Sequence, residues 1–333
     1  MLLEVRHVTR YHYAAPVRES VMEVWMQPQK TPRQRLTSFD LELDPAAQVF
    51  SYADPFGNAV YHFDVPQPHD QLTITARSVV ETSAPDALPE ALDLGEWDRL
   101  RSDRVLVENF DFLRQQGFCV ETEALRGFIA EHTLDRLRDR DPLTAVRKLS
   151  EYIYDAFDYE PGVTDAESPI DLALSARRGV CQDFAHIMIT ICRSWGIPAR
   201  YVSGYLFTDR EGGDRSDPDA SHAWLEVFLP STRWIGFDPT NNTPAGERHV
   251  SAAIGRDYAD VPPSRGVYKG EAESQLAVGV NVRRARATAG EPEFMRLASP
   301  SFARGGGRRR PGAGAFLLER QQQQQQQQAA PSK

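Results

Sequence analysis

Cys181 is the residue of this sequence best placed to act as a nucleophile. It directly precedes a helical pattern in which apolar residues recur at three- and four-residue steps, at Phe184, Ile187, Met188, Ile191 and Trp195. Gly196 and Pro198 mark the end of this helix, and residues 199–207 are expected to form a strand. A helix start favours an anion, because its N–H groups are unpaired and its dipole is positive there. Cys181 is therefore a candidate thiolate nucleophile.

Two later segments offer a base and an acid for this cysteine. Residues 221–230 and 233–242 are both expected to form strands that end in turn residues. If the hairpin is centred near Pro230, residues whose numbers sum to 460 face each other, which pairs His222 with Asp238. Opposed residues bring their Cβ atoms to about 5 Å, close enough for a carboxylate to hold an imidazole. A centre one residue later would offset the pair but leave it near contact.

A nucleophile at a helix start and a His–Asp pair on neighbouring strands form the set that an activated nucleophile requires. The alternative is that Cys181 is a buried structural cysteine, since a free cysteine usually behaves as a small hydrophobic residue. The presence of both partners favours the catalytic interpretation.

The three motifs also resemble a known family. Cys181 in GVCQDFAH, His222 in DASHAWLEVF and Asp238 in GFDPTNN resemble, in the same order, the core motifs of the transglutaminase-like superfamily. The bacterial branch, which carries an extra N-terminal β domain, is the most similar, and the resemblance covers residues 1–270. It implies an α+β protein, with a papain-like or transglutaminase-like catalytic core preceded by an N-terminal all-β sandwich.

The resemblance implies that Cys181 attacks an amide carbonyl to form a thioester. His222 would pass the thiol proton to the leaving amine, and Asp238 would fix the tautomer of His222. The backbone N–H of Cys181 is the natural first donor to the oxyanion, while the second donor cannot be identified. These three residues are the predicted catalytic set.

Three functions remain open at this point. The thioester can pass to water, which is hydrolysis of a peptide or amide bond, or to an amine, which is the transglutaminase reaction. The third alternative is a non-catalytic peptide-binding module, against which the intact triad argues. We favour hydrolysis because the polar, glycine-containing loop at 208–220 predicts an open, wet mouth. Trp224 and Trp234 lie on the strand faces of His222 and Asp238 and could instead line an apolar channel.

The 333 residues are enough for two domains. We expect an accessory β-sandwich at 1–85 and a catalytic domain at 86–280, with a helical part at 97–157 and a core at 158–270. The β-sandwich is expected because short strands with alternating apolar and polar residues precede residue 81. A Gly-, Arg- and Gln-rich tail at 281–333, which includes eight consecutive glutamines, is expected to be disordered.

The charge of the chain indicates which class of partner to expect, and its cysteines indicate the redox state of its compartment. Residues 281–333 hold ten Lys or Arg and three Asp or Glu, so of the net −9 the first 280 residues carry −16. This acidic body argues against a nucleic-acid partner, and we expect a protein or peptide substrate. No apolar run approaches the ~20 residues of a membrane span, and the N-terminus shows no signal-peptide pattern. Three sparse cysteines give no disulfide framework, so we expect a reduced cytoplasm.

We expect neither a cofactor nor a metal. The acidic residues of the 208–220 loop do not have the spacing of a calcium-binding loop. Cys119 has no base near it in the sequence and is expected to be structural. His186 lies five residues after Cys181, about 140° around the helix, and is poorly placed as the base. The oligomeric state cannot be predicted from the sequence.

Overall fold

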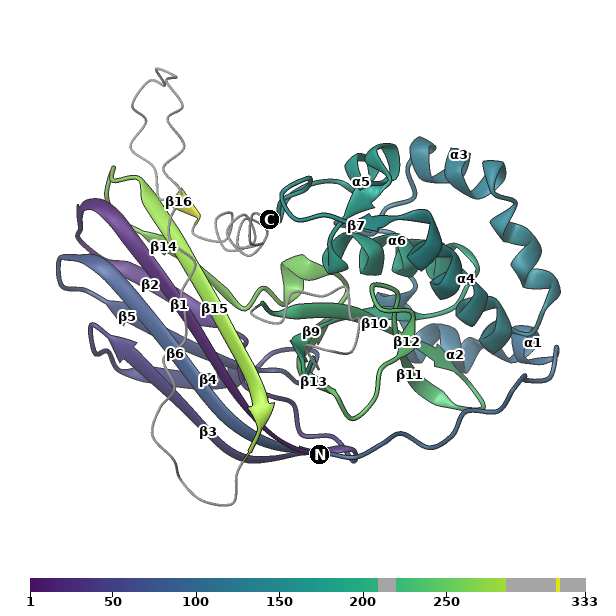
Figure 1. The fold of residues 1–333 in the computed structure, drawn as a ribbon, viewed down its shortest axis with the longest axis horizontal. Coiled ribbons are helices and arrows are strands. Elements are labelled where there is room, and N and C mark those ends of the chain that lie inside the picture. Colours follow the sequence, from purple (N-terminus) through teal and green to yellow (C-terminus); the bar gives the residue numbers. More distant parts are fainter. Residues whose placement is uncertain (209–219, 286–315, 318–333) are drawn as a thin grey trace.

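The computed structural model describes residues 1–208, 220–285 and 316–317 of the 333-residue chain. An N-terminal β-sandwich adjoins a core of helices packed on a separate sheet (Figure 1). This arrangement confirms the expected α+β class with an all-β N-terminal part. Within the described ranges, no helix is both long and apolar enough to cross a membrane.

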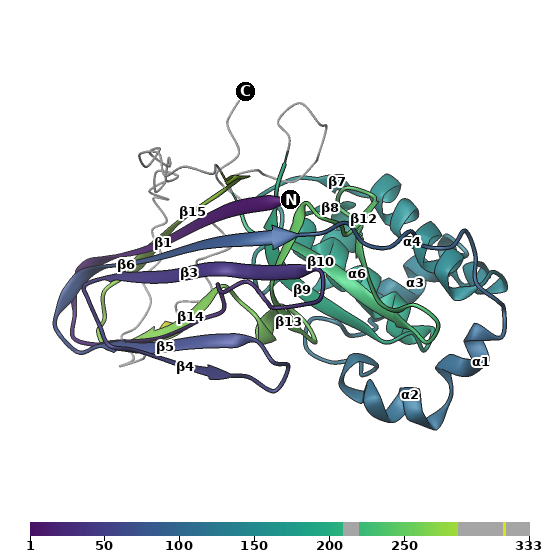
Figure 2. The same cartoon turned by 90° about the horizontal axis from the view of Figure 1, so that it is seen from below.

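The sandwich consists of two antiparallel sheets, which Figure 2 shows as stacked layers. The first sheet has the order β15-β1-β6-β3, with β1 at Leu2–Val17, β3 at Gln34–Asp44, β6 at His69–Thr82 and β15 at Ser274–Arg284. The second has the order β16-β14-β2-β5-β4, with β2 at Ser20–Val24, β4 at Val49–Ala53, β5 at Ala59–Val65, β14 at Ser264–Tyr268 and β16 at Phe316–Leu317. Alternating side chains such as Leu3, Val5, Tyr11 and Phe63 point inward and share one core.

The chain returns to this sandwich near its C-terminal end, which differs from the expected boundaries. We expected the catalytic domain to run to residue 280 and a disordered tail to start at 281. Instead β14 pairs with β2, and β15 pairs with β1 as far as Arg284 opposite Leu3. The buried residues of β15 alternate, at Leu276, Val278 and Val280. This short period-two signal merges into the Arg-rich segment, so composition alone set the boundary several residues too early.

Most of the expected tail lies outside the described residues. The exceptions are residues 281–285, most of which belong to β15, and β16, whose two residues pair with Val267 and Tyr268 at the edge of the second sheet.

The core sheet has the order β12-β11-β10-β9-β13 and is antiparallel. Its strands are β9 at Ala199–Leu206, β10 at His222–Leu229, β11 at Arg233–Asp238, β12 at Thr243–Pro244 and β13 at His249–Gly255. Helix α6, at Cys181–Ser194, packs across β9 and β10 (Figure 1). The expected apolar stripe of α6 is buried in the main hydrophobic cluster, which also contains Leu225 and Val227 of β10. Burying one such side chain stabilises the fold by about 1.5–3 kcal/mol.

Further helices and short strands lie between β6 and α6 along the chain. They are α1 (Glu96–Leu100), α2 (Asp103–Glu108), η1 (Phe110–Phe112), α3 (Glu123–Glu131), η2 (Leu134–Asp139), α4 (Pro142–Ala156), β7 (Asp158–Tyr159), α5 (Ile170–Ala176) and β8 (Arg178–Gly179), and η3 (Tyr258–Asp260) follows the core sheet. The α4 start shows why such a segment becomes helical. Asp141 caps it by accepting hydrogen bonds from the N–H groups of Leu143 and Thr144, and Pro142 occupies the first turn.

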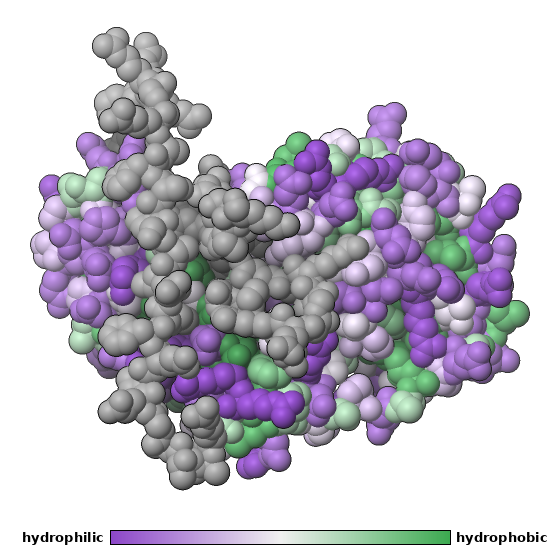
Figure 3. All heavy atoms as spheres, in the orientation of Figure 1, coloured by the Kyte–Doolittle hydropathy of each residue, from purple (hydrophilic) through white to green (hydrophobic). Residues whose placement is uncertain are grey.

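The visible surface is largely hydrophilic over both the sandwich and the helical part (Figure 3). Apolar side chains appear on it as small separate patches rather than as one continuous face. This agrees with a strongly charged folded body.

The position of β15 predicts the effect of two truncations. Removing residues 286–333 should leave the melting temperature within about 2 °C, because their composition offers no core and β16 adds only a two-residue pairing at the edge of its sheet. Removing residues 274–333 also takes β15 from β1 and exposes the sandwich core, so it should lower the melting temperature by more than ~10 °C or prevent folding. Thermal unfolding followed by circular dichroism checks both. A loss of several degrees in the shorter truncation would show that the tail docks on the folded body.

Candidate active site

Cys181 is the first residue of α6 and is half-buried. The turn before it is held by Asp183, because the N-cap residue Val180 has no side chain that can cap the helix. Asp183 Oδ2 accepts hydrogen bonds from the Val180 N–H at 2.8 Å and from Thr164 Oγ1 at 2.6 Å. A Cβ atom at Gly179 would lie 2.7 Å from the same oxygen, so only glycine fits there. The hydrogen bond from Val180 to Asp183 therefore fixes the path of the chain into Cys181.

Asp183 is itself buried within the fold. Burial raises the pKa of its carboxyl to about 6, although hydrogen bonds from Thr164 and Val180 oppose the shift. Its role is to shape the helix start.

His222 opens β10 and faces both expected partners. Its Nε2 lies 2.8 Å from Asp238 Oδ2, and its ring is hydrogen-bonded to the Cys181 thiol. Burial disfavours the charged imidazolium, but the negative charge of Asp238 and hydrogen bonds with Asp238 and Cys181 outweigh it. Together they raise the pKa of His222 to about 10. The structure therefore brings Cys181, His222 and Asp238 into one connected group.

The hairpin register differs from the predicted one. Leu225 pairs with Phe237 and Leu229 with Arg233, so paired residue numbers sum to 462 rather than 460. The reason is a three-residue connection at 230–232, which is followed by Arg233 with a φ of 65°. Asp238 thus lies diagonal to His222 instead of directly opposite, a separation that these side chains still span. This is the offset alternative that the sequence left open.

The buried carboxylate of Asp238 has several hydrogen-bond donors. Its Oδ2 accepts from His222, from Asn241 Nδ2 at 2.8 Å and from His249 Nε2 at 3.2 Å. Its Oδ1 accepts from the backbone N–H groups of Thr240 and Asn241 at 3.0 and 3.3 Å. Burial alone would raise the pKa of Asp238, but the neighbouring imidazoles and their hydrogen bonds hold it well below its usual range. Asp238 is therefore an anion within the fold.

His249 belongs to this group and was missed at the sequence level. It is buried at the start of β13, and its Nδ1 accepts a hydrogen bond from the Gly246 N–H at 3.1 Å. Burial lowers the pKa of His249, so the ring is neutral and its one proton sits on Nε2, facing Asp238. No local signal identified it, because β13 pairs with β9 rather than with the strand that carries Asp238.

His222, Asp238 and His249 also have the spacing of a metal site, with one potential ligand atom each within 4.8 Å of one another. Two observations favour hydrogen bonding instead. Both imidazole Nε2 atoms lie within hydrogen-bond distance of a single carboxylate oxygen. The Nε2 of His249 carries its proton and so has no lone pair for a metal. We therefore assign these side chains to a hydrogen-bond network.

The two tryptophans expected near the site pack against different residues. Trp224 is buried with its ring against His222, at 6.0 Å between centroids, and against His249, at 5.1 Å. It fits because Gly204 has no side chain, and a Cβ there would lie 2.7 Å from the indole. Trp234 packs instead against Phe112, Phe228 and Arg200, away from these histidines. Trp224 thus supports the imidazoles from behind, and the alternative of an apolar channel lined by both tryptophans is not supported by their positions.

The remaining cysteines and His186 are structural. Cys119 and Cys192 are fully buried, and burial raises the pKa of both thiols to about 12. His186 accepts a hydrogen bond from the Tyr258 N–H and stacks on Phe118, and burial lowers its pKa to about 3. These positions agree with the expectations for Cys119 and His186.

Two family models match this sequence, and one of them covers all three candidate catalytic residues. Residues 3–81 match the family model described as the bacterial transglutaminase-like N-terminal region. Residues 131–239 match the model of the transglutaminase-like superfamily, and this range contains Cys181, His222 and Asp238.

Relatives extend the match over most of the chain. An uncharacterised protein of Mycobacterium leprae is 34% identical over 85% of this chain and 98% of its own length. An uncharacterised protein of Mycobacterium tuberculosis is 36% identical over 84% of this chain and 91% of its own. A Pseudomonas aeruginosa protein-glutamine gamma-glutamyltransferase is 30% identical over 34% of this chain and 18% of its own.

A solved structure agrees with the fold. It is a Cytophaga hutchinsonii protein described as a candidate cysteine protease, with a TM-score of 0.65 and 21% identity. The alignment covers 88% of this chain and 94% of that one. At this identity the likeness concerns the fold alone.

Cys181 should be the most reactive of the three thiols. It is half-buried beside His222, whereas the other two are fully buried and hold their protons. Iodoacetamide at neutral pH, followed by peptide mass spectrometry, should label Cys181 at least about a hundredfold faster than Cys119 or Cys192. Equal labelling of all three in the folded protein would contradict the assignment.

His249 should affect Cys181 through Asp238. His249→Phe removes one hydrogen-bond donor from the buried carboxylate of Asp238 and should slow Cys181 alkylation about tenfold. A tenfold change corresponds to the lower end of the free-energy range for a hydrogen bond to a charged group. His7→Phe is the matched control, because His7 is also a buried, neutral histidine but lies in the sandwich. A purely structural His249 would lower the melting temperature and leave the alkylation rate of the folded variant unchanged.

Proposed function

Because the chain belongs to the transglutaminase-like superfamily, we propose that it is a cysteine-dependent enzyme that cleaves a peptide or amide bond through a thioester. The observation that carries this proposal is the connected group of Cys181 thiol, His222 imidazole and Asp238 carboxylate. The expected substrate is a protein or peptide. No catalytic cofactor or metal enters the proposed reaction.

In the first half of the reaction, His222 already holds the Cys181 proton, because its raised pKa favours the imidazolium, and Cys181 Sγ attacks the carbonyl carbon as the thiolate. The proton sits on Nδ1, because Nε2 faces Asp238. The tetrahedral oxyanion forms next to the start of α6, where the Cys181 N–H and the helix dipole favour negative charge. The C–N bond then breaks, His222 returns the proton to the leaving amine, and a thioester remains on Cys181.

In the second half, His222 takes a proton from water as the oxygen attacks the thioester carbonyl. The C–S bond breaks, the carboxylic acid leaves, and the proton remains on His222 beside the Cys181 thiolate. Asp238 takes no proton in either half. It keeps Nε2 of His222 turned toward itself and Nδ1 toward Cys181, and it stabilises the imidazolium.

Water is favoured over an amine as the acceptor. Water is present at about 55 M, so an amine wins only in a site that binds it and excludes water. Among the described residues, Trp224 is packed behind His222 and Trp234 lies elsewhere, so neither builds an apolar tunnel to Cys181. The loop at 209–219, which we expected to form a wet mouth, lies outside the described residues.

Transfer to an amine is the second candidate function. It is favoured by the similarity to the P. aeruginosa protein-glutamine gamma-glutamyltransferase over a third of this chain. The two reactions share the thioester and differ only in what resolves it.

A reduced compartment suits this chemistry, and we propose the cytoplasm. Cys119, Cys181 and Cys192 are all free thiols. A thiol nucleophile depends on remaining reduced.

A product assay separates the two functions. The protein is given a glutamine-containing peptide and a fluorescent primary amine at millimolar concentration, and the products are quantified by mass spectrometry. Hydrolysis predicts cleaved or deamidated peptide with little amine incorporation, while efficient incorporation would overturn it in favour of transfer. Cys181→Ala should abolish either product.

Asp238→Asn should reduce turnover without unfolding the protein, by up to about four orders of magnitude, as in a serine triad. The matched control is Asp257→Asn, since Asp257 is a buried carboxylate whose pKa is raised by burial and which lies outside the Cys181 group. Wild-type turnover in a folded Asp238→Asn protein would remove Asp238 from the mechanism.

A further inference from the structure

A cavity lies where the sandwich, the helical segment and the core sheet meet. Its volume is about 640 Å³, within the usual range for ligand sites, which often form at such junctions. The sandwich contributes Trp25, Tyr52, Asp54, Pro55 and Phe56. Residues 107–112 supply a second wall, and Arg200, Ile254, Arg256, Asp260 and Arg265 supply the third.

The cavity is separate from the Cys181 group. Arg193, near the C-terminal end of α6, donates hydrogen bonds to the carbonyls of Phe112 and Arg256, which both line the cavity. Twelve residues separate Cys181 from Arg193, which is about 18 Å along a helix. The cavity therefore lies at the opposite end of α6 from the proposed nucleophile.

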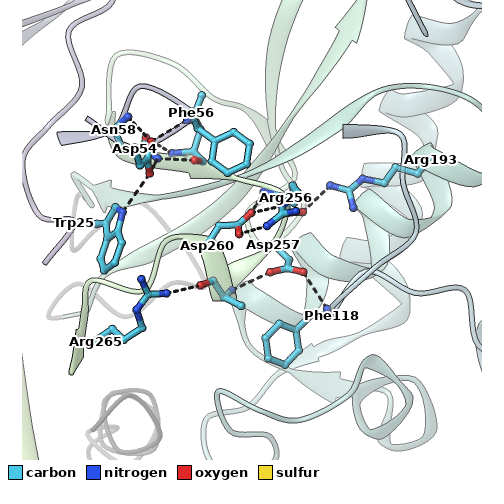
Figure 4. Close-up of polar contacts among 12 residues, drawn as sticks. Trp25, Asp54, Phe56, Asn58, Phe118, Arg193, Arg256, Asp257, Asp260 and Arg265 are labelled. Carbon is cyan, nitrogen blue, oxygen red and sulfur yellow. Dashed lines mark hydrogen bonds and ion pairs between the residues drawn. The ribbon is translucent and has the colours of Figure 1, made fainter. Parts of the chain in front are cut away.

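The walls are braced by polar contacts that cross between the domains (Figure 4). Asp54 accepts hydrogen bonds from Trp25 Nε1, from the Phe56 N–H and from Asn58 Nδ2. The fully buried Asn58 also bonds both the N–H and the carbonyl of Ile254 in β13. These hydrogen bonds fix the sandwich wall of the cavity to β13 of the core sheet.

The three arginines of the wall already have carboxylate partners. Arg200 pairs with Glu226, Arg256 with Asp260 through two parallel bonds, and Arg265 with Glu23. Each guanidinium also lies over an aromatic ring: Arg200 over Trp234, Arg256 over Phe56 and Arg265 over Trp25. An anionic ligand would have to displace these partners, so the arginines act as braces rather than as an anion site.

Negative charge is in excess around the cavity. The hydrogen bond of Arg256 with Asp260 raises the pKa of its guanidinium against the effect of burial, and the charges of Asp260, Asp257 and Asp111 add to the rise. Asp111 is exposed at the mouth, and its neighbour Glu108 is paired with Arg104. Among the described residues, the hydrogen-bond donors to Asp54 are uncharged N–H groups. A ligand that brings positive charge is therefore complementary to this site.

Exposed apolar side chains surround the same opening. Phe110 is 58% exposed, Val107 76% and Tyr52 48%, and all three line the cavity. Tyr52 lies on β4, which ends its sheet and, among the described strands, pairs only with β5. An edge strand can accept an extended polypeptide through its free backbone groups.

We propose that this cavity binds an extended basic segment of a partner polypeptide, with an apolar or aromatic side chain in the cavity and Lys or Arg against its acidic mouth. The aromatic wall favours the apolar group, and the exposed carboxylate of Asp111 favours the cation. The acidic folded body would steer such a partner to it. This site does not depend on the proposed reaction at Cys181.

The test is fluorescence anisotropy of a labelled peptide containing KFKFK, added to the full-length Cys181→Ser protein. This variant removes turnover, so binding is measured whether or not the proposed reaction is correct. Peptides containing EFEFE and KSKSK reverse the charge and remove the aromatic groups. The proposal predicts that KFKFK binds at least about tenfold tighter than either, and that its binding weakens with salt.

Two matched pairs of variants locate the site. Phe110→Ser should weaken KFKFK binding at least about tenfold, while Leu172→Ser, an exposed apolar residue on α5 outside the lining, should change it less than about twofold. Asp111→Lys should weaken binding, while Asp40→Lys, an exposed acid on β3, should not. These positions are on the surface, so the variants should fold.

Three results would overturn the proposal. One is equal or tighter binding of EFEFE. Another is unchanged binding in both Phe110→Ser and Asp111→Lys. The last is much tighter binding by a protein that ends at Ala285, which would show that the chain's own residues 286–333 compete for the site.

Discussion

The buried carboxylate of Asp238 is the group on which the rest of the site depends. An ionised carboxylate without solvent is strongly unfavourable unless donors surround it. The donors come from His222 at the start of β10, from residues 240–241 after β11 and from His249 at the start of β13. This one charge therefore joins three parts of the core sheet. The same charge keeps the imidazole of His222 turned toward Cys181.

Helix α6 is the second fixed element, and it is held at both ends. At its start, Asp183 fixes the turn that leads into Cys181. Near its end, the buried guanidinium of Arg193 donates to the carbonyls of Phe112, Arg114 and Ala199, among others. A nucleophile on such an element keeps its position relative to a base on the adjoining sheet. The two ends of this helix also separate the proposed reaction site from the acidic, aromatic cavity.

The parts of the structure that sequence predicted are those encoded by neighbouring residues. The apolar period and the Gly196–Pro198 stop define α6 locally, so the position of Cys181 was predictable. The hairpin was also local, but its register depended on the turn at 230–232, whose length the sequence did not reveal. His249 and strand β15 were missed because they pair with segments far away in the chain, β9 and β1. Periodicity does not report such long-range partners.

A double-mutant cycle on His222 and Asp238 tests most directly whether these residues act on Cys181 as one unit. The rate of Cys181 alkylation is measured in the wild type, His222→Ala, Asp238→Asn and the double variant, each shown to be folded by circular dichroism. Since Asp238 acts only through His222 in this account, removing the carboxylate should slow the wild type strongly and change the His222→Ala protein less than about twofold. Equal slowing by Asp238→Asn in both backgrounds would contradict it.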